Sequence, residues 1–222
     1  MEKYFNFPIP LLKAAFKNGL PYVLNSILDY AIYKHSLKLD GDPEKQIKDS
    51  ASYFNVTLGN IRRTLQNGES MMNDSKIRGP MSGINKSVFW DYYNNYKTEF
   101  EIVLLLAYLS VKSIIGPDAY KRITNDFMFC RMAGYNSQKE MEGLPEELQR
   151  YKTRKYIGKI KKGLKENFGL KVYGRYTHGF YVTFKLTFEQ LVREIETNRK
   201  RNKDNDLKKR EKEIINKVLN EV

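Results

Sequence analysis

Apolar residues recur at helical spacing through most of the first half of the chain. This pattern predicts a short helix over residues 10–19, a longer one that begins at Pro21, and two further helices over residues 43–54 and 57–66. Asparagine followed by glycine is typical of a helix end, so the pair at positions 67 and 68 is expected to end the last of these helices. The first half is therefore predicted to be helical.

The second half begins with a strong helix signal. Thr98 and Glu101 form a capping box, which opens a predicted helix over residues 101–115. Because this helix is apolar on nearly every side, we expect it to lie buried in the centre of the protein. Two more helices are predicted, over residues 118–134 and 152–168.

After Gly169 the pattern changes from helical to extended. Residues 170–175 and 179–186 are rich in β-branched and aromatic side chains and are separated by a short polar turn. This arrangement predicts a β-hairpin. A second capping box at Thr187 opens a further predicted helix, which extends to about Thr197.

These elements predict a mainly α fold with a small β-hairpin, divided into two modules. The first module covers residues 1–68 and the second covers residues 86–197. Residues 69–85 are rich in Gly, Ser, Asn and Pro and are expected to form a linker. Residues 198–222 form a charged tail of mixed sign, which we expect to be helical and which carries a weak apolar stripe.

Charge adds a functional expectation to this fold. The 222 residues include 39 Lys and Arg against 26 Asp and Glu, a net charge of +13. Such an excess suggests a polyanionic partner, most often nucleic acid and less often a membrane surface or an acidic protein. Residues 1–100 carry a net charge of +3 and residues 101–222 a net charge of +10, so any electrostatic interface is expected mainly in the second half.

The segment around residues 47–67 has the pattern of two helices that cross closely. Ala51 is small enough for close crossing, and Asn55 lies between Phe54 and Val56, where it can adopt the left-handed backbone conformation of a tight turn. Thr57 is expected to cap the second helix, and Ile61 and Leu65 are expected to form its buried side.

Over about 20 residues this segment resembles the helix-turn-helix family of DNA-binding proteins. It departs from the family in having Asn55 where glycine is usual, and Gly59 weakens the second helix by roughly 1 kcal/mol relative to alanine. The resemblance implies that one set of side chains faces the major groove: Thr57, Asn60, Arg62, Arg63 and Gln66. The alternative is a plain helical hairpin with a charged outer face.

A second candidate is the predicted helix over residues 152–168. Between residues 152 and 175 the chain carries nine basic side chains, and Glu166 alone opposes them. Ile157, Ile160, Leu164 and Phe168 share one helix face, and basic residues occupy the opposite face. We expect this helix to bury its apolar side and expose a cationic one, which can bind phosphates or remain a solvated surface without a ligand.

A basic helix followed by a hairpin resembles the winged-helix family over about residues 100–186. The resemblance assigns the helix over 152–168 to DNA recognition and the hairpin to the wing, and the acidic loop over 136–151 is long for this family. It implies a set of DNA-contacting residues on the helix and the wing: Arg154, Lys155, Lys159, Lys162, Lys165, Arg175 and His178.

Other signals are weaker. The aromatic segment over residues 88–96 is more typical of packing between domains, although such side chains can also stack on unpaired bases. Cys130 has no cysteine partner, and His35 and His178 are far apart in sequence, so no metal-ligand spacing is present. We expect no enzyme activity, no metal and no cofactor.

Taken together, the two modules resemble the initiator proteins of plasmid or phage replication and also two-domain repressors. The resemblance implies binding of duplex DNA. The single cysteine and the short apolar run over residues 102–109 lead us to expect a cytoplasmic protein without a membrane-spanning segment. A homodimer through the C-terminal tail is a further expectation. One alternative is a structural or interaction protein of a phage or mobile element, whose basic face binds an acidic partner. RNA binding is another.

Overall fold

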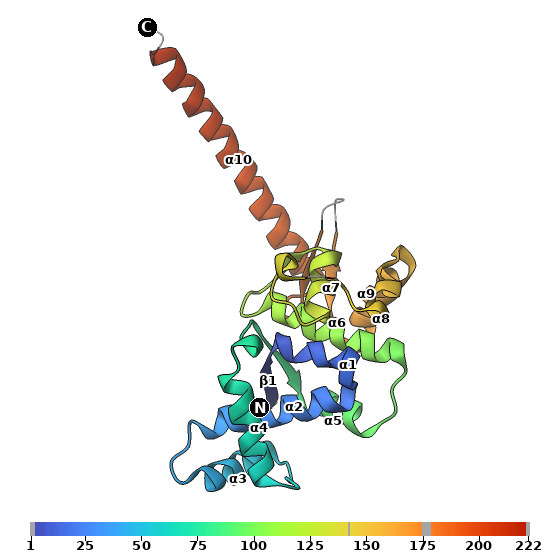
Figure 1. Ribbon diagram of the computed structural model, residues 1–222. Helices are drawn as coiled ribbons and strands as arrows, with labels where there is room; N and C mark the ends of the chain where they lie inside the picture. The colour runs from blue at the N-terminus through green and yellow to red at the C-terminus, as the bar shows by residue number, and fades with distance from the viewer. Residues whose placement is uncertain (1–2, 142, 175–178, 221–222) are drawn as a thin grey trace.

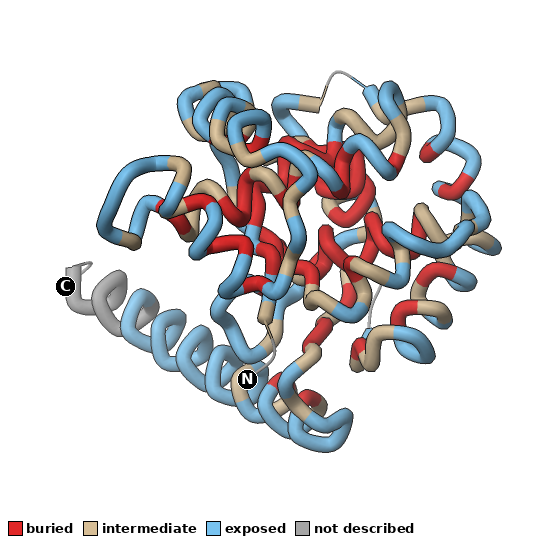
Figure 2. Tube along the Cα trace, turned by 90° about the horizontal axis from the view of Figure 1, so that it is seen from below, coloured by how far each residue is buried: buried red, intermediate tan, exposed pale blue. Residues whose placement is uncertain are grey.

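The structure is a computed structural model that describes residues 3–141, 143–174 and 179–220 (Figure 1). Within these residues the chain is mainly helical, and its short strands form two small antiparallel sheets. The predicted fold class, a mainly helical chain with a β-hairpin, is confirmed. Buried residues run through the whole body of the molecule (Figure 2).

The first half is built around one long helix. The elements are β1 (Tyr4–Pro8), the 3-10 segment η1 (Ile9–Ala14), α1 (Ala15–Asn18), α2 (Leu20–Ser36), α3 (Pro43–Phe54), α4 (Ile61–Asn73), η2 (Ser75–Ile77), β2 (Met81–Asn85) and α5 (Lys86–Asn94). Helix α2 contacts α3, α4 and α5 and also packs on β1. Its apolar face, which includes Val23 and Ile27, is buried as its periodicity predicts.

Helix α4 differs from its prediction at both ends. It begins at Ile61 and continues to Asn73, so the pair Asn67 and Gly68 does not end it. Gly68 instead permits a close approach to α2, since a Cβ atom at this position would lie 2.2 Å from the Cβ atom of Tyr33. Asn67 contributes to the same contact, donating a hydrogen bond of 2.8 Å to Asp29. The pair Asn67 and Gly68, which predicted a helix end, instead allows α4 to pack closely on α2.

Residues 69–85, predicted to form a linker, belong to the folded body. They hold the last turns of α4, the segment η2 and β2, which pairs with β1 in antiparallel register from Tyr4 opposite Asn85 to Pro8 opposite Met81. The Ser82 hydroxyl is buried and donates a 2.7 Å hydrogen bond to the carbonyl of Leu109. This bond ties the sheet of the first half to the central helix of the second half.

Apart from short segments between α7 and α9, the second half follows in the order helix, strand, helix, helix, strand, strand, helix. Its main elements are α6 (Glu99–Ile115), β3 (Lys121–Ile123), α7 (Asn125–Met132), α9 (Arg154–Phe168), β4 (Lys171–Tyr173), β5 (Phe180–Thr183) and α10 (Phe188–Asn220). Between α7 and α9 lie η3 (Gln138–Glu140), α8 (Glu146–Gln149) and η4 (Arg150–Lys152). The capping box at Thr98 is present, and α6 is buried along most of its length, as predicted.

The sheet of the second half has one strand that the sequence did not predict. Strand β5 lies in the middle and pairs with β4 on one side and β3 on the other. Residues 118–134 had been predicted to be one helix, but β3 and the break before Asn125 divide this segment. A three-residue strand is stabilised by its partner rather than by its own sequence, so it leaves little local signal.

The two halves share one continuous hydrophobic core. At their boundary the Asn136 side chain donates a 3.1 Å hydrogen bond to the carbonyl of Arg78. Close by, a Cβ atom at Gly134 would lie 2.6 Å from the backbone nitrogen of Lys13. The predicted modules are therefore in direct contact, and β2 takes part in that contact through its packing on α6.

Helix α10 leaves the body at the three-stranded sheet and projects away from it (Figure 1). It has 33 residues, and a helix of this length extends about 50 Å. Residues 199–213 are all exposed. Among the described residues, no helix combines the length and the apolar character needed to cross a membrane.

Candidate nucleic-acid interface

Helix α9 is held against α6 by its apolar side. Ile160 and Leu164 are buried, and Ile157 and Phe168 are partly buried. A Cβ atom at Gly163 would lie 2.9 Å from both methyl carbons of Leu104, so the two helices are in close contact there. This packing fixes which face of α9 is turned outward, and the outward face is the one predicted from the helical period.

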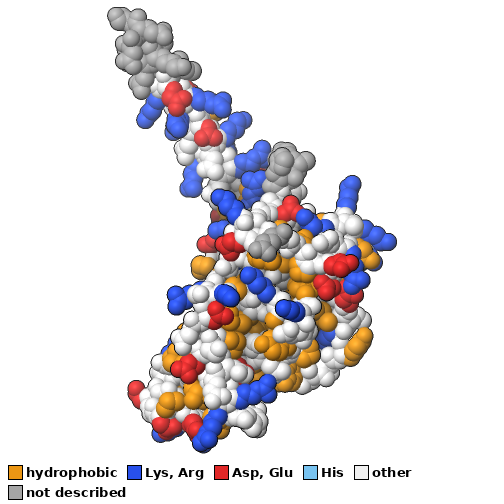
Figure 3. Space-filling model, in the orientation of Figure 1, with side chains coloured by type: hydrophobic (Ala, Val, Ile, Leu, Met, Phe, Trp, Pro, Cys, Tyr) orange, Lys and Arg blue, Asp and Glu red, His pale blue; other side chains and the backbone are white. Residues whose placement is uncertain are grey.

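The outward face of α9 carries five cationic side chains, and all five are exposed: Arg154, Lys155, Lys159, Lys162 and Lys165. Lys162 lies 3.8 Å from a carboxylate oxygen of Glu166, in an exposed pair that contributes little. For the other four, the described part of the chain shows no ion pair with a carboxylate. Figure 3 shows Lys and Arg side chains on the side of the body where α9 lies, and more of them along α10.

Two neighbouring lysines are engaged within the protein. Lys161 is half-buried, with its Nζ atom 3.6 Å from the centre of the Phe180 ring. Burial lowers its pKa, and repulsion from Lys165 lowers it further. Lys152 forms a 2.8 Å ion pair with Asp126 at the start of α7. Lys161 holds α9 to the sheet, and Lys152 holds η4, just before α9, to α7. Both are separate from the exposed cationic face of α9.

The acidic segment before α9 is folded against the second half. Leu148 and Tyr151 are buried, and the Tyr151 hydroxyl donates a 3.1 Å hydrogen bond to Glu99. Arg150 also pairs with Glu99. Part of the acidic charge of the loop over 136–151 stays exposed in Glu146 and Glu147. This long loop connects α7 to α9 and contains η3, α8 and η4.

The wing residues can be placed only in part. Strands β4 and β5 pair from Lys171 opposite Thr183 to Tyr173 opposite Tyr181. Arg175 and His178 were predicted to contact DNA from the turn between these strands, but they lie outside the described residues.

The first candidate segment forms the turn between α3 and α4. Asn55 has φ 50° and ψ 54°, which is the left-handed conformation expected from the sequence. Ala51 and Phe54 are buried, again as expected. The helix cap, however, was wrongly assigned to Thr57. Helix α4 starts later, and the side chain of Asn60 caps it by accepting a 3.0 Å hydrogen bond from the backbone N–H of Arg63.

The buried side of α4 also differs from its prediction. Thr64 and Gly68 are the buried residues, whereas Ile61 and Leu65 are only partly buried. The hydroxyl of Thr64 donates a 2.8 Å hydrogen bond to Asp29 on α2. Polar contacts with α2 therefore hold this helix alongside the expected apolar ones.

The five predicted contact residues of this segment are all exposed, but they have different surroundings. Arg62 forms a 2.9 Å ion pair with Glu44 of α3. Thr57, Asn60 and Arg63 line a cleft of about 470 Å³ between α2, the α3–α4 turn and α5. Gln66 lies one turn further along α4. The segment thus presents a cleft rather than a single convex helix face.

The structure does not bring the two candidate segments together. In Figure 1, α3 and α4 lie at one end of the body, and α9 lies near the end from which α10 projects. Within the described residues, the cleft beside α4 contains residues of the first set and none of the second. Any nucleic acid that contacts both segments has to extend along the molecule.

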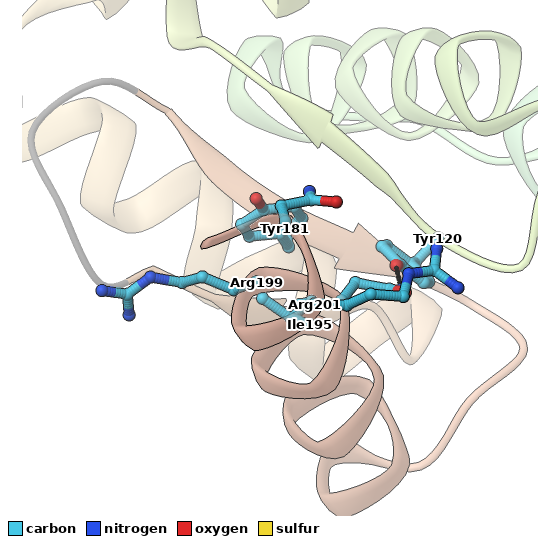
Figure 4. A pocket seen from close by; sticks show the side chains of 7 residues that line it. Tyr120, Tyr181, Ile195, Arg199 and Arg201 are labelled. Atoms are coloured by element: carbon cyan, nitrogen blue, oxygen red, sulfur yellow. Dashed lines mark hydrogen bonds between the residues drawn. The ribbon is translucent and has the colours of Figure 1, made fainter. Parts of the chain in front are cut away.

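Sequence reasoning missed a third polar region, at the base of α10. A hollow of about 360 Å³ lies between this helix and the sheet, lined by Tyr120, Tyr181 and Ile195 among others (Figure 4). The Tyr120 hydroxyl accepts a 2.7 Å hydrogen bond from Asn198, and Arg199 and Arg201 point in opposite directions from the helix (Figure 4). Tyr120 lies just before β3, in the segment predicted to be one helix over 118–134, so the sequence did not place it beside α10.

The structure also shows the surroundings of the groups considered for chemistry. Within the described residues, no three side chains of His, Cys, Asp or Glu gather where a metal ion could bind. The Cys130 thiol is buried, and burial raises its pKa. His35 lies 3.0 Å from the Ser50 hydroxyl and stacks on Tyr53.

Comparison with known proteins gave no relative. No family model, no curated protein and no solved structure matches this chain. The functional argument therefore depends on the residues and contacts described above.

Proposed function

We propose that this protein binds duplex DNA through the exposed cationic face of α9. The proposal depends on one observation, the placement of five cations on one outward face: Arg154, Lys155, Lys159, Lys162 and Lys165. Among the described contacts, Glu166 is the acidic residue near this face, and it pairs with Lys162. Four of these five cations show no ion pair with a carboxylate in the described part of the chain, so they can neutralise phosphates and release counterions.

The order of elements supports the same proposal. Apart from the short segments η3, α8 and η4 between α7 and α9, the chain from α6 to β5 runs helix, strand, helix, helix, strand, strand, with β5 between β3 and β4. This order is similar to that of winged-helix DNA-binding domains, in which the helix before the hairpin enters the major groove. In this comparison α9 has the position of the recognition helix. The α3–α4 hairpin would be a second contact, as its resemblance to helix-turn-helix proteins implies.

A gel-shift titration with random-sequence duplex DNA tests the proposal. Five phosphate contacts give an expected slope of about −4 to −5 for the logarithm of affinity against the logarithm of salt concentration. Absence of binding even at low salt would overturn the proposal and favour an acidic protein as the partner of this face.

We further propose a role as a replication initiator or a transcriptional regulator, because the sequence resembles initiator proteins and two-domain repressors in having two helix-turn-helix-like segments. Selection of bound sequences from a random duplex pool distinguishes the two. Direct repeats indicate an initiator-like array, and a palindrome indicates a symmetric dimer. A dimer through α10 is part of this proposal, since α10 projects from the body and Leu207 is 48% exposed on it. Sedimentation of the full chain measures the oligomeric state directly.

A further inference from the structure

The cleft beside the start of α4 has two aromatic walls that are held in place by buried neighbours. Trp90 and Tyr93 of α5 line the cleft, with ring centres 5.3 Å apart and planes at 81°. Both rings contact Phe89, which is fully buried and also packs on Phe5 of β1. Tyr93 is 41% exposed, so an aromatic face remains accessible from solvent. The cleft therefore offers a rigid surface for stacking.

Hydrogen-bond donors surround these rings. The Tyr93 hydroxyl donates a 3.0 Å hydrogen bond to the Oδ1 atom of Asn25, which leaves the amide N–H groups of Asn25 available. Asn60 uses its Oδ1 atom to cap α4, which leaves its own amide N–H groups available. The guanidinium of Arg63 adds further donors at the same cleft. Donors of this kind complement the carbonyl oxygens of a flat heterocycle.

The charge of the cleft does not favour an isolated phosphate. Asp29 also lines it and accepts hydrogen bonds of 2.8 Å from Thr64 and from Asn67. One acidic group and the single cation Arg63 leave the cleft about neutral. The cleft volume of about 470 Å³ is within the range of about 300–1,000 Å³ typical of pockets for small ring compounds. A flat, polar and weakly charged ring fits these features best.

We propose that this cleft binds an unpaired base of a single-stranded nucleic acid. The inference rests on the proposed function as a nucleic-acid-binding protein and adds a second kind of contact to it. The base stacks on Trp90 or Tyr93 and accepts hydrogen bonds from Asn25 and Asn60, while Arg63 is placed at the rim for the adjoining phosphate. A base within a duplex cannot enter, because its two faces are covered by its neighbours.

Intrinsic fluorescence gives a direct test, since Trp90 is the single tryptophan of the chain. Emission from the full-length protein is measured during titration with a short oligothymidylate, an oligouridylate and a blunt duplex. We expect one or both single strands to quench the emission and the duplex to quench it far less, because a base inside a duplex cannot stack on Trp90. The comparison of the two single strands shows whether DNA or RNA supplies the base. The quenching should persist at salt concentrations that abolish duplex binding, because stacking releases few counterions.

Variants identify the cleft as the binding site. Tyr93→Ala and Asn25→Ala should each weaken oligonucleotide binding, by about tenfold or more for the loss of stacking on Tyr93. Tyr96→Ala is the matched control, because Tyr96 is 93% exposed, does not line the cleft, and follows the same helix. It should bind like the unmodified chain. Circular dichroism of each variant verifies that the fold is retained.

The outcomes separate this inference from the proposed function. If the duplex shifts in gels but neither single strand alters the Trp90 emission, the cleft proposal is overturned and the role of α9 is unaffected. If quenching occurs but Tyr93→Ala and Asn25→Ala bind as tightly as Tyr96→Ala, the base binds elsewhere and the cleft proposal is again overturned. If the unmodified protein binds no duplex but its emission is quenched by a single strand, the proposed role of α9 is overturned and the cleft proposal stands.

Discussion

Gly68 of α4 and Tyr33 of α2 are in such close contact that no larger residue fits at position 68. A Cβ atom there would lie 2.2 Å from the Cβ atom of Tyr33 and 3.2 Å from the carbonyl oxygen of Asp29. Both obstacles are close to the backbone of α2, so the two helices would have to move apart. This contact fixes the position of the α3–α4 hairpin and therefore the shape of the cleft beside it.

We predict that Gly68→Ala destabilises the protein by about 1–3 kcal/mol, because the cost of overpacking exceeds the gain in helix propensity. Urea denaturation of the full chain measures the change. Gly158→Ala is the matched control, since Gly158 lies within α9 and a Cβ atom there would meet nothing within 4 Å. It should stabilise the protein by about 0.5–1 kcal/mol. Equal effects of the two substitutions would contradict the packing argument.

The carboxylate of Asp29 is predicted to couple α2 to α4 energetically. It accepts hydrogen bonds of 2.8 Å from the Thr64 hydroxyl and from the Asn67 amide. A double-mutant cycle with Asp29→Ala and Thr64→Ala should give a coupling of about 1–2 kcal/mol, as expected for a hydrogen bond to a charged group. Additive effects in urea denaturation would show that this bond does not stabilise the fold.

Stability is predicted to decrease with acidification through the histidine range because of His35. Burial lowers the pKa of His35, and the charges of Lys38 and Lys3 lower it further. The unfolded chain therefore takes up a proton at higher pH than the folded one, near the ordinary value of about 6.5. Neutral His35 makes its full contribution to the free energy of unfolding above about pH 6.5. That contribution is lost as pH falls from this value through the lowered pKa of the folded state. Urea denaturation across this range should show the loss, and His35→Phe should reduce it.

The cationic face of α9 is predicted to act mainly through phosphates. Lys159→Ala combined with Lys162→Ala should weaken binding to all duplex sequences alike, by about ten- to hundredfold at low salt, and reduce the salt slope by about 2. The control pair is Lys208→Ala with Lys209→Ala, which removes the same charge from exposed positions on α10. A similar loss in both double variants would indicate a general charge effect rather than an interface on α9.

Local signals in the sequence predicted those parts of the fold that depend on neighbouring residues. The capping boxes at Thr98 and Thr187 are present, and Asn55 adopts the left-handed conformation expected of it. The buried face of α9 also follows from its helical period, because burial of one side is the main reason that an amphipathic helix forms. The exposed lysines of α9 lie on the helix face opposite the buried one.

Features that depend on distant contacts could not be predicted. Strand β3 has three residues and exists through its pairing with β5, some 60 residues later. Strand β2 pairs with β1 across the whole first half, so its composition alone suggested a linker. Gly68 gave the wrong helix end, since glycine serves both to end helices and to bring them together. The cleft was missed because Asn25 and Tyr93 meet only in the folded chain.

Helix α10 is attached to the body only near its base, so its far end is distant from the contacts that hold it among the described residues. Ile195 is buried at the base of α10. Next to it, Glu196 accepts a hydrogen bond from the Tyr173 hydroxyl, and Asn198 donates one to the Tyr120 hydroxyl. Beyond this point the helix continues to Asn220, about 33 Å further on. A tilt of about 10° at the base would move the far end by about 6 Å. The direction in which the far end of the helix points is therefore set by the packing around Tyr120 and Tyr173.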